Sequence, residues 1–268
     1  MKPSAVIKLS SPATHEFWEI PVLFEDEHLL ALDKPSGLLT SPDRYDPNRP
    51  NLMKLLHAGI AESKPWARER GLTYLSNAHR LDFETSGIIL LAKTKPVLVQ
   101  LADLFGAEKP VKKYIALVQG TPVEDQFEID AKLSPHPVKV GLMRVDHKHG
   151  KKSKTKFTVL EKFANHTLML CEPLTGRTHQ IRIHLRHAGV PIVGDQLYGG
   201  KPLWLSRLKP NYRLKPGKEE RPLLARVALH AEQLELNHPV TNQPVAITAP
   251  WPKDLTVAVK YLRQFTAA

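Results

Sequence analysis

The sequence predicts an α+β fold, in which paired strands are interrupted by isolated helices. Short apolar runs of strand length are bounded by turn residues, and several lie close enough to form hairpins. Longer stretches instead carry the apolar stripe and the terminal residues of helices. The chain has 268 residues, enough to bury the core of one large domain or of two small ones. Both kinds of element are therefore expected to pack around a substantial core.

The composition is that of an ordinary globular protein, with 42% hydrophobic and 24% charged residues. Lys and Arg number 38 against 27 Asp and Glu, and the formal net charge of +11 argues for a polyanionic partner. The single cysteine, Cys171, excludes an intrachain disulfide framework, and its apolar neighbours predict a buried structural thiol. No segment has the apolar length of a membrane span or the continuous apolar stretch of a signal peptide, so a cytoplasmic protein is expected.

The beginning of the chain is expected to be a short extension. Pro3 and Pro12 interrupt residues 1–20, and no regular element is predicted there. The folded domain then covers residues 21–268.

The first half of this domain predicts strands and helices in turn. Residues 22–40 favour two short strands around the acidic EDEH, followed by a turn at KPSG. A helix is predicted over 51–60 and a buried strand over 87–92. A second helix is predicted over 95–106, with Pro96 in its first turn and a glycine at its end.

The second half begins with a strand at 112–120 that is apolar on both faces and is therefore expected to be central in a sheet. A hairpin is predicted from 157–163 and 166–173. GRTHQIRIHLRHAG at 176–189 favours a helix capped by Thr178, although its alternating apolar residues also permit a strand.

The last part of the chain is richer in turns. A turn-rich loop is predicted at 191–200. Residues 201–226 carry eight Lys and Arg against two Glu, and their prolines predict a long basic excursion. A closing hairpin over 228–252 and a helix over 254–265 complete the prediction.

The strongest candidate for chemistry is HRLDFETSG at 79–87. It places Asp82 two residues after Arg80 and leads directly into the buried strand. A strand can fix such a loop while the loop stays open to a ligand. A surface ion pair beside a turn is the alternative interpretation.

Two other kinds of site find less support in the sequence. Among the histidines of the 176–189 segment, His184 and His187 share a helix face, but His179 turns away, so structural histidines are favoured over a metal site. A glycoside hydrolase needs two opposed carboxyl groups. Asp82 and Glu84 are only two residues apart, and no second carboxylate motif is present.

A lysine-rich segment at 148–156 is the first electrostatic feature. KHGKKSKTK carries five lysines, and lysines this dense repel one another unless a polyanion is near. A solvated loop is the usual interpretation of such a run. The segment lacks the glycine spacing of a phosphate-binding P-loop.

Several blocks of the sequence resemble the RluA-type RNA pseudouridine synthases. HRLDFETSG looks like the signature of that family, and further blocks agree in order and spacing. These blocks are KPSG at 34–37, KKYIALV at 112–118, GRTHQIRIH at 176–184, GDQLYGG at 194–200, and LHA with HP at 229–231 and 238–239. The resemblance extends from about Val22 to about Pro252, nearly the whole chain.

The resemblance implies a mixed, mainly antiparallel central sheet with a basic cleft, and a catalytic Asp82. This carboxylate would attack C1′ of a flipped uridine or abstract its 2′ proton, and the sequence leaves both open. Tyr114 matches the tyrosine that stacks on the uracil and takes the C5 proton. Arg177 matches the residue that pairs with the aspartate, and Arg80 the one that fills the gap left by the flipped base. Ile181 corresponds to an apolar contact for the base.

The remaining expectations concern RNA binding. His79 and Thr85 of the signature are expected to contact the substrate. Lys151, Lys152 and Lys154, with the basic excursion, are expected to hold the RNA backbone, since the first twenty residues are too few for an S4-type module. The partner is a structured rRNA or tRNA, no metal or cofactor is required, and a monomer is expected. A catalytically silent RNA-binding factor is the alternative, although the aspartate, tyrosine and arginine are all present.

Overall fold

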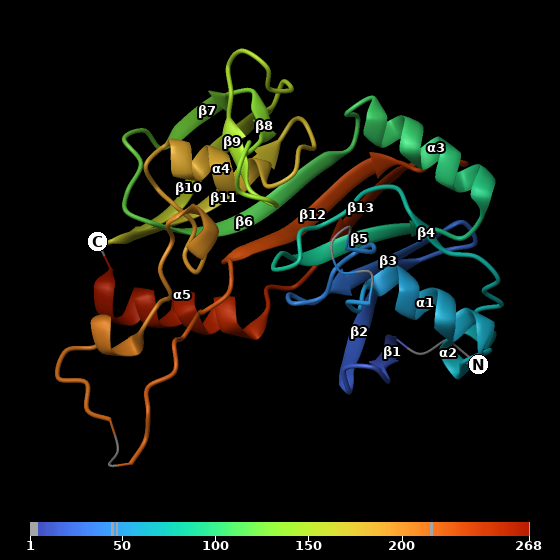
Figure 1. Cartoon of the computed structure of the whole chain (residues 1–268), viewed down its shortest axis with the longest axis horizontal. Helices are drawn as coiled ribbons and strands as arrows, with labels where there is room; N and C mark the ends of the chain where they lie inside the picture. Colours follow the sequence, from blue (N-terminus) through green and yellow to red (C-terminus); the bar gives the residue numbers. More distant parts are fainter. Residues whose placement is uncertain (1–4, 44–45, 47, 215–216, 268) are drawn as a thin grey trace. The chain divides into compact units, whose positions relative to one another are not determined.

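The computed structural model describes residues 5–43, 46, 48–214 and 217–267 (Figure 1). The chain forms two compact units, each made of two chain segments. The first comprises Met1–Val111 and Ala231–Pro250, and the second comprises Lys112–His230 and Trp251–Ala268. The predicted α+β class is confirmed, with strands mainly in antiparallel pairs. Among the described residues, no helix combines the length and the apolarity needed to cross a membrane.

The first unit is built on the strand order β1-β2-β3-β5-β12, with β4 paired to β5 and β13 paired to β12. Its strands are β1 (Val6–Ser11), β2 (Glu16–Glu25), β3 (Leu29–Lys34), β4 (Ser76–Asn77), β5 (Ser86–Ala92), β12 (Leu229–Asn237) and β13 (Pro244–Thr248). Its helices are α1 (Leu52–Ala61), α2 (Pro65–Arg68) and α3 (Lys95–Gly106). β12 begins with two residues of the second unit and continues in the first.

The central strands of this unit are apolar on both faces because helices cover both. Figure 1 shows α1 and α3 on opposite sides of β3 and β5. Alternate residues Leu30, Leu32, Ile89 and Leu91 pack in one cluster with α1 and α2. Their neighbours Leu29, Ala31, Ile88 and Leu90 pack in another with α3. The buried strand predicted at 87–92 is thus confirmed, and it holds the end of the HRLDFETSG loop between two layers.

The predicted helices of this unit are confirmed with local caps. α1 begins after Asn51, whose side chain accepts a hydrogen bond from the Lys54 N–H at 2.9 Å. α3 spans the predicted residues, and Thr94 is its N-cap.

The expectation of no regular element in residues 1–20 is wrong. β1 pairs antiparallel with β2 from Val6↔Pro21 to Ser11↔Glu16. Pro12 lies in the turn between these strands, where its missing N–H costs the sheet no ladder hydrogen bond. Pro3 lies outside the described residues.

The second unit contains the antiparallel order β6-β11-β10-β7 and a separate pair, β8-β9. Its strands are β6 (Val111–Gln119), β7 (Gln126–Asp130), β8 (Leu133–Pro135), β9 (Met143–Val145), β10 (Lys154–Phe163) and β11 (His166–Pro173). Its helical elements are α4 (Gln180–His187), the short 3₁₀ turns η1 (Gln196–Tyr198) and η2 (Leu205–Arg207), and α5 (Lys253–Thr266). The strands predicted at 112–120, 157–163 and 166–173 and the C-terminal helix are confirmed.

The core of the second unit joins these strands to α5 and α4. Buried residues of α5, including Leu255 and Leu262, pack with Phe157 and Leu117 of the sheet. The predicted helix after Arg177 is confirmed, but the Thr178 cap is wrong. The N-cap is His179, which has φ +54° and no side-chain capping bond.

Candidate active site

The aspartate loop, residues 79–87, runs from β4 to β5 in the first unit. Asp82 is half-buried, Arg80 is exposed and Thr85 is 2% exposed. The Asp82 carbonyl accepts from the Thr85 N–H at 3.2 Å, which closes a turn around Phe83 and Glu84. The Asp82 carboxylate therefore lies on a tight turn that leads directly into β5.

The KPSG turn holds this loop from beneath through a buried lysine. Lys34 is 0% exposed, and its Nζ donates to the carbonyls of Pro35 and Leu38 at 2.8 and 2.7 Å. The same Nζ lies 3.5 Å from the Phe83 carbonyl. Gly37, at φ +81°, donates its N–H to that carbonyl at 2.9 Å. One ammonium and one turn glycine thus hold the carbonyl of Phe83, the residue after Asp82.

Two hydroxyl groups hold the backbone of Leu81, before Asp82, and of Glu84, after Phe83. Ser36 Oγ donates to the Glu84 carbonyl at 2.7 Å. Thr40 Oγ1 donates to the Leu81 carbonyl at 3.0 Å and accepts from the Leu81 N–H at 3.1 Å. The backbone is therefore bonded on both sides of Asp82, which fixes the point from which its side chain extends.

Aromatic contacts hold the start and the middle of the loop. His79 Nε2 accepts from the Leu90 N–H at 2.9 Å, and its ring stacks on Phe105 with centroids 4.6 Å apart. The Arg49 guanidinium carbon lies 3.9 Å from the centre of the Phe83 ring. His79 thus anchors the loop to β5 and α3. Its predicted contact with substrate stays a prediction, as does that of Thr85.

Gly87 ends the loop at a point of close backbone approach. Its φ is +109°, and a Cβ on it would lie 2.2 Å from the carbonyl oxygen of Ala231 in β12. Any side chain would push the two strands apart. The last residue of the motif therefore has to be glycine for the loop to join the sheet.

A titratable group lies beside this turn. Asp33 pairs with Ile88 in the register of β3 and β5. Burial raises the pKa of the Asp33 carboxyl to about 6, and the charge of Lys34 opposes that rise. Asp33 is therefore partly protonated just below neutral pH.

Tyr114 and Ile181 belong to the second unit. Tyr114, on β6, is half-buried against the core and lies opposite Cys171 of β11. Cys171 is fully buried as predicted, and that burial raises the pKa of its thiol. Ile181 is 4% exposed within the core cluster. Its predicted contact with a base remains a prediction.

Arg177 is held by a network centred on Gln180. The Gln180 Oε1 accepts from the Arg177 N–H at 3.0 Å and from Thr175 Oγ1 at 2.6 Å. Its Nε2 donates to the Lys154 carbonyl and to Thr155 Oγ1, both at 2.9 Å. Gln180 thus uses both ends of its amide to fix the Arg177 backbone to β10.

The guanidinium of Arg177 is itself bonded to the lysine-rich segment, because its Nε donates to the Lys152 carbonyl at 2.9 Å. The Lys151 and Lys152 side chains are exposed. Lys154, in contrast, pairs with Glu128, and this hydrogen bond raises the pKa of the Lys154 ammonium. The segment is thus a turn followed by the start of β10. Of the three lysines predicted to hold the RNA backbone, Lys151 and Lys152 are the more accessible.

Two polar clusters in this unit escaped the sequence analysis. Arg182 and Asp195 form a buried bidentate pair with N–O distances of 2.7 and 2.8 Å. His179 Nδ1 lies 2.8 Å from the hydroxyl of Tyr198. The GDQLYGG block, matched only by resemblance, therefore braces α4. Opposite charges thirteen residues apart were the available signal for the ion pair.

The histidines of the 176–189 segment serve as structural groups. His184 is 0% exposed, with Nδ1 2.9 Å from Thr155 Oγ1 and Nε2 3.1 Å from Ser153 Oγ. Burial lowers the pKa of His184, so the neutral ring is favoured. Within the described ranges, no group of three or more His, Cys, Asp or Glu residues is placed to hold a metal ion.

The basic excursion at 201–226 is anchored at its base. The Leu203 N–H donates to the Leu224 carbonyl at 2.9 Å, and both side chains are buried in the core. The predicted site residues therefore fall into two sets. Asp82, Arg80, His79 and Thr85 lie in the first unit, and Tyr114, Arg177, Ile181 and the three lysines lie in the second.

Comparison with known proteins now adds to this geometry. A family model described as RNA pseudouridylate synthase matches residues 28–187, which include the aspartate loop, Tyr114 and Arg177. The chain belongs to this family. It is therefore a pseudouridine synthase, an isomerase that acts on RNA, as the sequence resemblance predicted.

Curated relatives agree over nearly the full chain. Ribosomal large subunit pseudouridine synthase D of Xanthomonas campestris is 33% identical, over 98% of this chain and 75% of the relative. Ribosomal large subunit pseudouridine synthase C of Vibrio vulnificus is 36% identical, over 90% of this chain and 69% of the relative.

Solved structures support the fold. Human RNA pseudouridylate synthase domain containing 4 matches with a TM-score of 0.66 at 24% identity, covering 90% of this chain and 92% of that one. Human RNA pseudouridylate synthase domain containing 1 gives a TM-score of 0.62 at 25% identity, with 87% and 84% covered.

Proposed function

We propose that this pseudouridine synthase modifies uridines of large-subunit ribosomal RNA, with Asp82 as the catalytic group. The observation that carries the role of Asp82 is the bonding of its neighbours, since Leu81, Phe83 and Glu84 are each held through backbone atoms. The names of the relatives from two bacteria support the choice of RNA. The net charge of +11 supports a polyanionic substrate.

The reaction is an isomerisation, and its atoms balance without water. The bond between ribose C1′ and uracil N1 breaks, the base rotates, and C5 bonds to C1′. The C5 proton leaves, and N1 gains a proton. One carboxylate beside C1′ is sufficient, because the uracil that leaves through N1 is the same group that bonds again to C1′ through C5. No water has to be activated. Both units take part in this proposal, including the β1-β2 hairpin that the sequence had placed outside the folded domain.

Asp82 has two possible roles in that reaction, attack on C1′ as a nucleophile or removal of the 2′ proton. Deuterium at C2′ of the target uridine separates them. A primary isotope effect on the single-turnover rate identifies proton abstraction as the slow step. An unchanged rate, with a covalent sugar adduct on Asp82 trapped by a slow substrate, identifies nucleophilic attack.

The other matched residues take supporting roles in the proposal. Arg177 supplies positive charge to the reaction. Tyr114 stacks on the uracil, and its phenol relays the C5 proton by releasing its own. Arg80, which is exposed, fills the space left by the flipped nucleotide.

The central test compares two carboxylates of one loop. Asp82→Asn is expected to bind unmodified large-subunit rRNA within about twofold of wild type and to form no pseudouridine, a loss of at least about 10⁴-fold in rate. Glu84→Gln removes the neighbouring carboxylate and is expected to keep most of the activity. Single-turnover assays with mapping of the modified position measure both.

Product from Asp82→Asn at near the wild-type rate would overturn the catalytic assignment. Wild-type activity on tRNA and none on rRNA would replace the proposed substrate. Tight RNA binding by the wild type with no product on either RNA would favour the silent RNA-binding alternative.

A further inference from the structure

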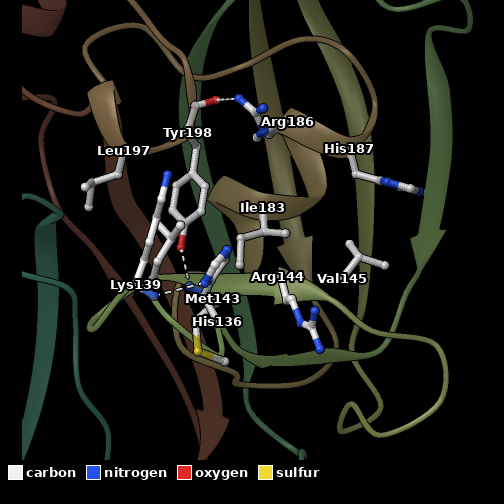
Figure 2. Close-up of a pocket in the computed structure, with 11 residues that line it drawn as sticks. His136, Lys139, Met143, Arg144, Val145, Ile183, Arg186, His187, Leu197 and Tyr198 are labelled. Atoms are coloured by element: carbon white, nitrogen blue, oxygen red, sulfur yellow. Dashed lines mark hydrogen bonds between the residues drawn. The ribbon is translucent and has the colours of Figure 1, made fainter.

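A basic pocket in the second unit is lined by residues that are not among those matched to the reaction. Its volume is about 530 Å³, within the range of small-ligand sites. One wall is the β8-β9 hairpin with its connecting loop, and the other is formed by α4 and η1 (Figure 2). The lining residues are His136, Lys139, Leu142, Met143, Arg144, Val145, Ile183, Arg186, His187, Leu197 and Tyr198.

The walls of this pocket are tied together by Tyr198. Its side chain is 3% exposed, and its hydroxyl accepts from the Met143 N–H of β9 at 3.1 Å. Its backbone carbonyl accepts from Arg186 Nη1 of α4 at 2.7 Å. Figure 2 shows the Tyr198 ring extending from η1 toward Met143. One aromatic residue therefore connects the hairpin, the helix and the 3₁₀ turn.

The connecting loop of the hairpin is also ordered by its own bonds. His136 Nδ1 accepts from the N–H groups of Val138 and Lys139 at 3.2 and 3.0 Å. The Leu142 carbonyl accepts from the His136 N–H at 2.8 Å. The Lys139 side chain is thus presented at the pocket by a closed turn.

The charge of the lining has one sign. Lys139, Arg144 and Arg186 are cationic, and no carboxylate belongs to the lining. Asp146, just outside it, bonds to Arg144 Nη2 at 3.0 Å and balances that charge in part. An anionic ligand is therefore favoured.

The rest of the lining is apolar and in part exposed. Leu197 is 58% exposed, and Leu142 and Val145 are half-buried. A free phosphate would use the cations and leave these side chains in water. A nucleotide uses both, because its base packs on apolar side chains while its phosphate meets the cations.

We infer that this pocket binds one unpaired nucleotide of the RNA substrate, with the base between Leu142 and Leu197 and the phosphate at Lys139 and Arg144. The inference rests on the proposed function, because it needs RNA as the substrate. The pocket adds a contact that fixes which stem-loop is held, apart from the uridine that reacts.

The test removes two pocket charges and compares the result with two matched charges elsewhere in the unit. Lys139→Gln/Arg144→Gln is expected to weaken binding of unmodified large-subunit rRNA by about tenfold at physiological salt and to lower the salt slope by about 1.5. The control is Lys253→Gln/Lys260→Gln, which changes two exposed lysines of α5. Its expected effect is under about twofold.

A second measurement tests the apolar wall without changing charge. Leu142→Ser/Leu197→Ser is expected to weaken binding about fivefold and leave the salt slope unchanged. RNA substituted with 4-thiouridine should cross-link to residues 136–145 or 197–198 in the wild type, and this cross-link should be lost in the charge variant. Circular dichroism and thermal unfolding confirm that each variant is folded.

Affinity of the Lys139→Gln/Arg144→Gln variant equal to that of the α5 control would overturn the inference, as would cross-links that avoid both segments. If the charge variant loses affinity but free phosphate competes as well as uridine monophosphate, the pocket is an anion site and the nucleotide assignment is wrong. A wild-type enzyme that forms no product on rRNA refutes the proposed function instead, and the cross-link then reports on RNA binding alone.

Discussion

The aspartate loop and the lysine-rich segment show two ways of presenting charge to RNA. In the loop, the residues around Asp82 are bonded through their backbone atoms to a turn with a buried ammonium. In the segment, Lys151 and Lys152 extend as exposed side chains from the residues just before β10. A reacting carboxylate requires a fixed position, whereas a lysine that neutralises a phosphate requires only proximity. Substitutions should accordingly damage the two regions in different ways.

The largest effect is expected at Gly87. Gly87→Ala has to move the Ala231 carbonyl and to adopt an unfavourable φ, so it should lower the free energy of unfolding by about 4 kcal/mol. Gly106→Ala is the control, because nothing lies within 4 Å of its Cβ position and the residue is helical. It should be neutral or stabilising by up to about 1 kcal/mol. Urea unfolding measures both, and equal stabilities would contradict the close approach to β12.

The second-largest effect on stability is expected for Lys34→Met. It leaves the carbonyls of Pro35 and Leu38 without their ammonium partner, and the expected loss is about 3 kcal/mol with a fall in kcat. Lys54→Met, on the exposed face of α1, should change stability by less than about 0.5 kcal/mol. A Lys34 variant with wild-type stability and kcat would show that the turn does not position the loop.

The lysine-rich segment should respond in RNA binding and not in stability. Lys151→Gln/Lys152→Gln is expected to weaken rRNA binding about tenfold and to lower the salt slope by about 1.5, with stability unchanged within about 0.5 kcal/mol. Lys154→Gln should have a smaller effect on binding, because Lys154 is paired with Glu128. Filter binding at several salt concentrations measures this, and a variant with the wild-type slope would exclude these lysines from the RNA contact.

The smallest effect is expected at Asp33. Its pKa is about 6 in the folded protein against an ordinary value of 3.8, so folding favours the protonated form. That contribution is complete below pH 3.8 and disappears as the pH rises through 6. Relative to Asp33→Asn, the wild type should lose about 1 kcal/mol or less between pH 4 and 7, after allowance for screening by solvent. Parallel pH profiles for the two proteins would contradict the assignment.

Local signals explain which parts of the fold the sequence could predict. α3 was placed correctly because Pro96, its apolar stripe and Gly106 all lie within the helix. The β1-β2 hairpin was missed because a proline indicates only that a regular element is interrupted. It does not show whether Pro12 breaks one strand or lies in the turn between two strands. Thr178 failed as a cap because the helix begins only at Gln180, so that His179 occupies the N-cap position.

The sequence motifs of the candidate site could be predicted, but the contacts that hold its backbone in place could not. The resemblance supplied Asp82, Tyr114 and Arg177 as a set. It did not show that Lys34 and Thr40 hold the backbone around Asp82, because those contacts join residues more than forty positions apart. The pocket around Tyr198 combines a hairpin, a helix and a loop, so no single stretch of sequence marks it.

The two-segment construction of the first unit bears on how the protein matures on the ribosome. The strand that packs on Gly87 begins at Leu229, and β13 ends at Thr248. More than half of the chain is therefore synthesised between β5 and its neighbour β12. The second unit also needs α5, at residues 253–266, to complete its core. Both halves consequently finish folding only when the last strands and helix have been made, so the aspartate loop gains its full support late in synthesis.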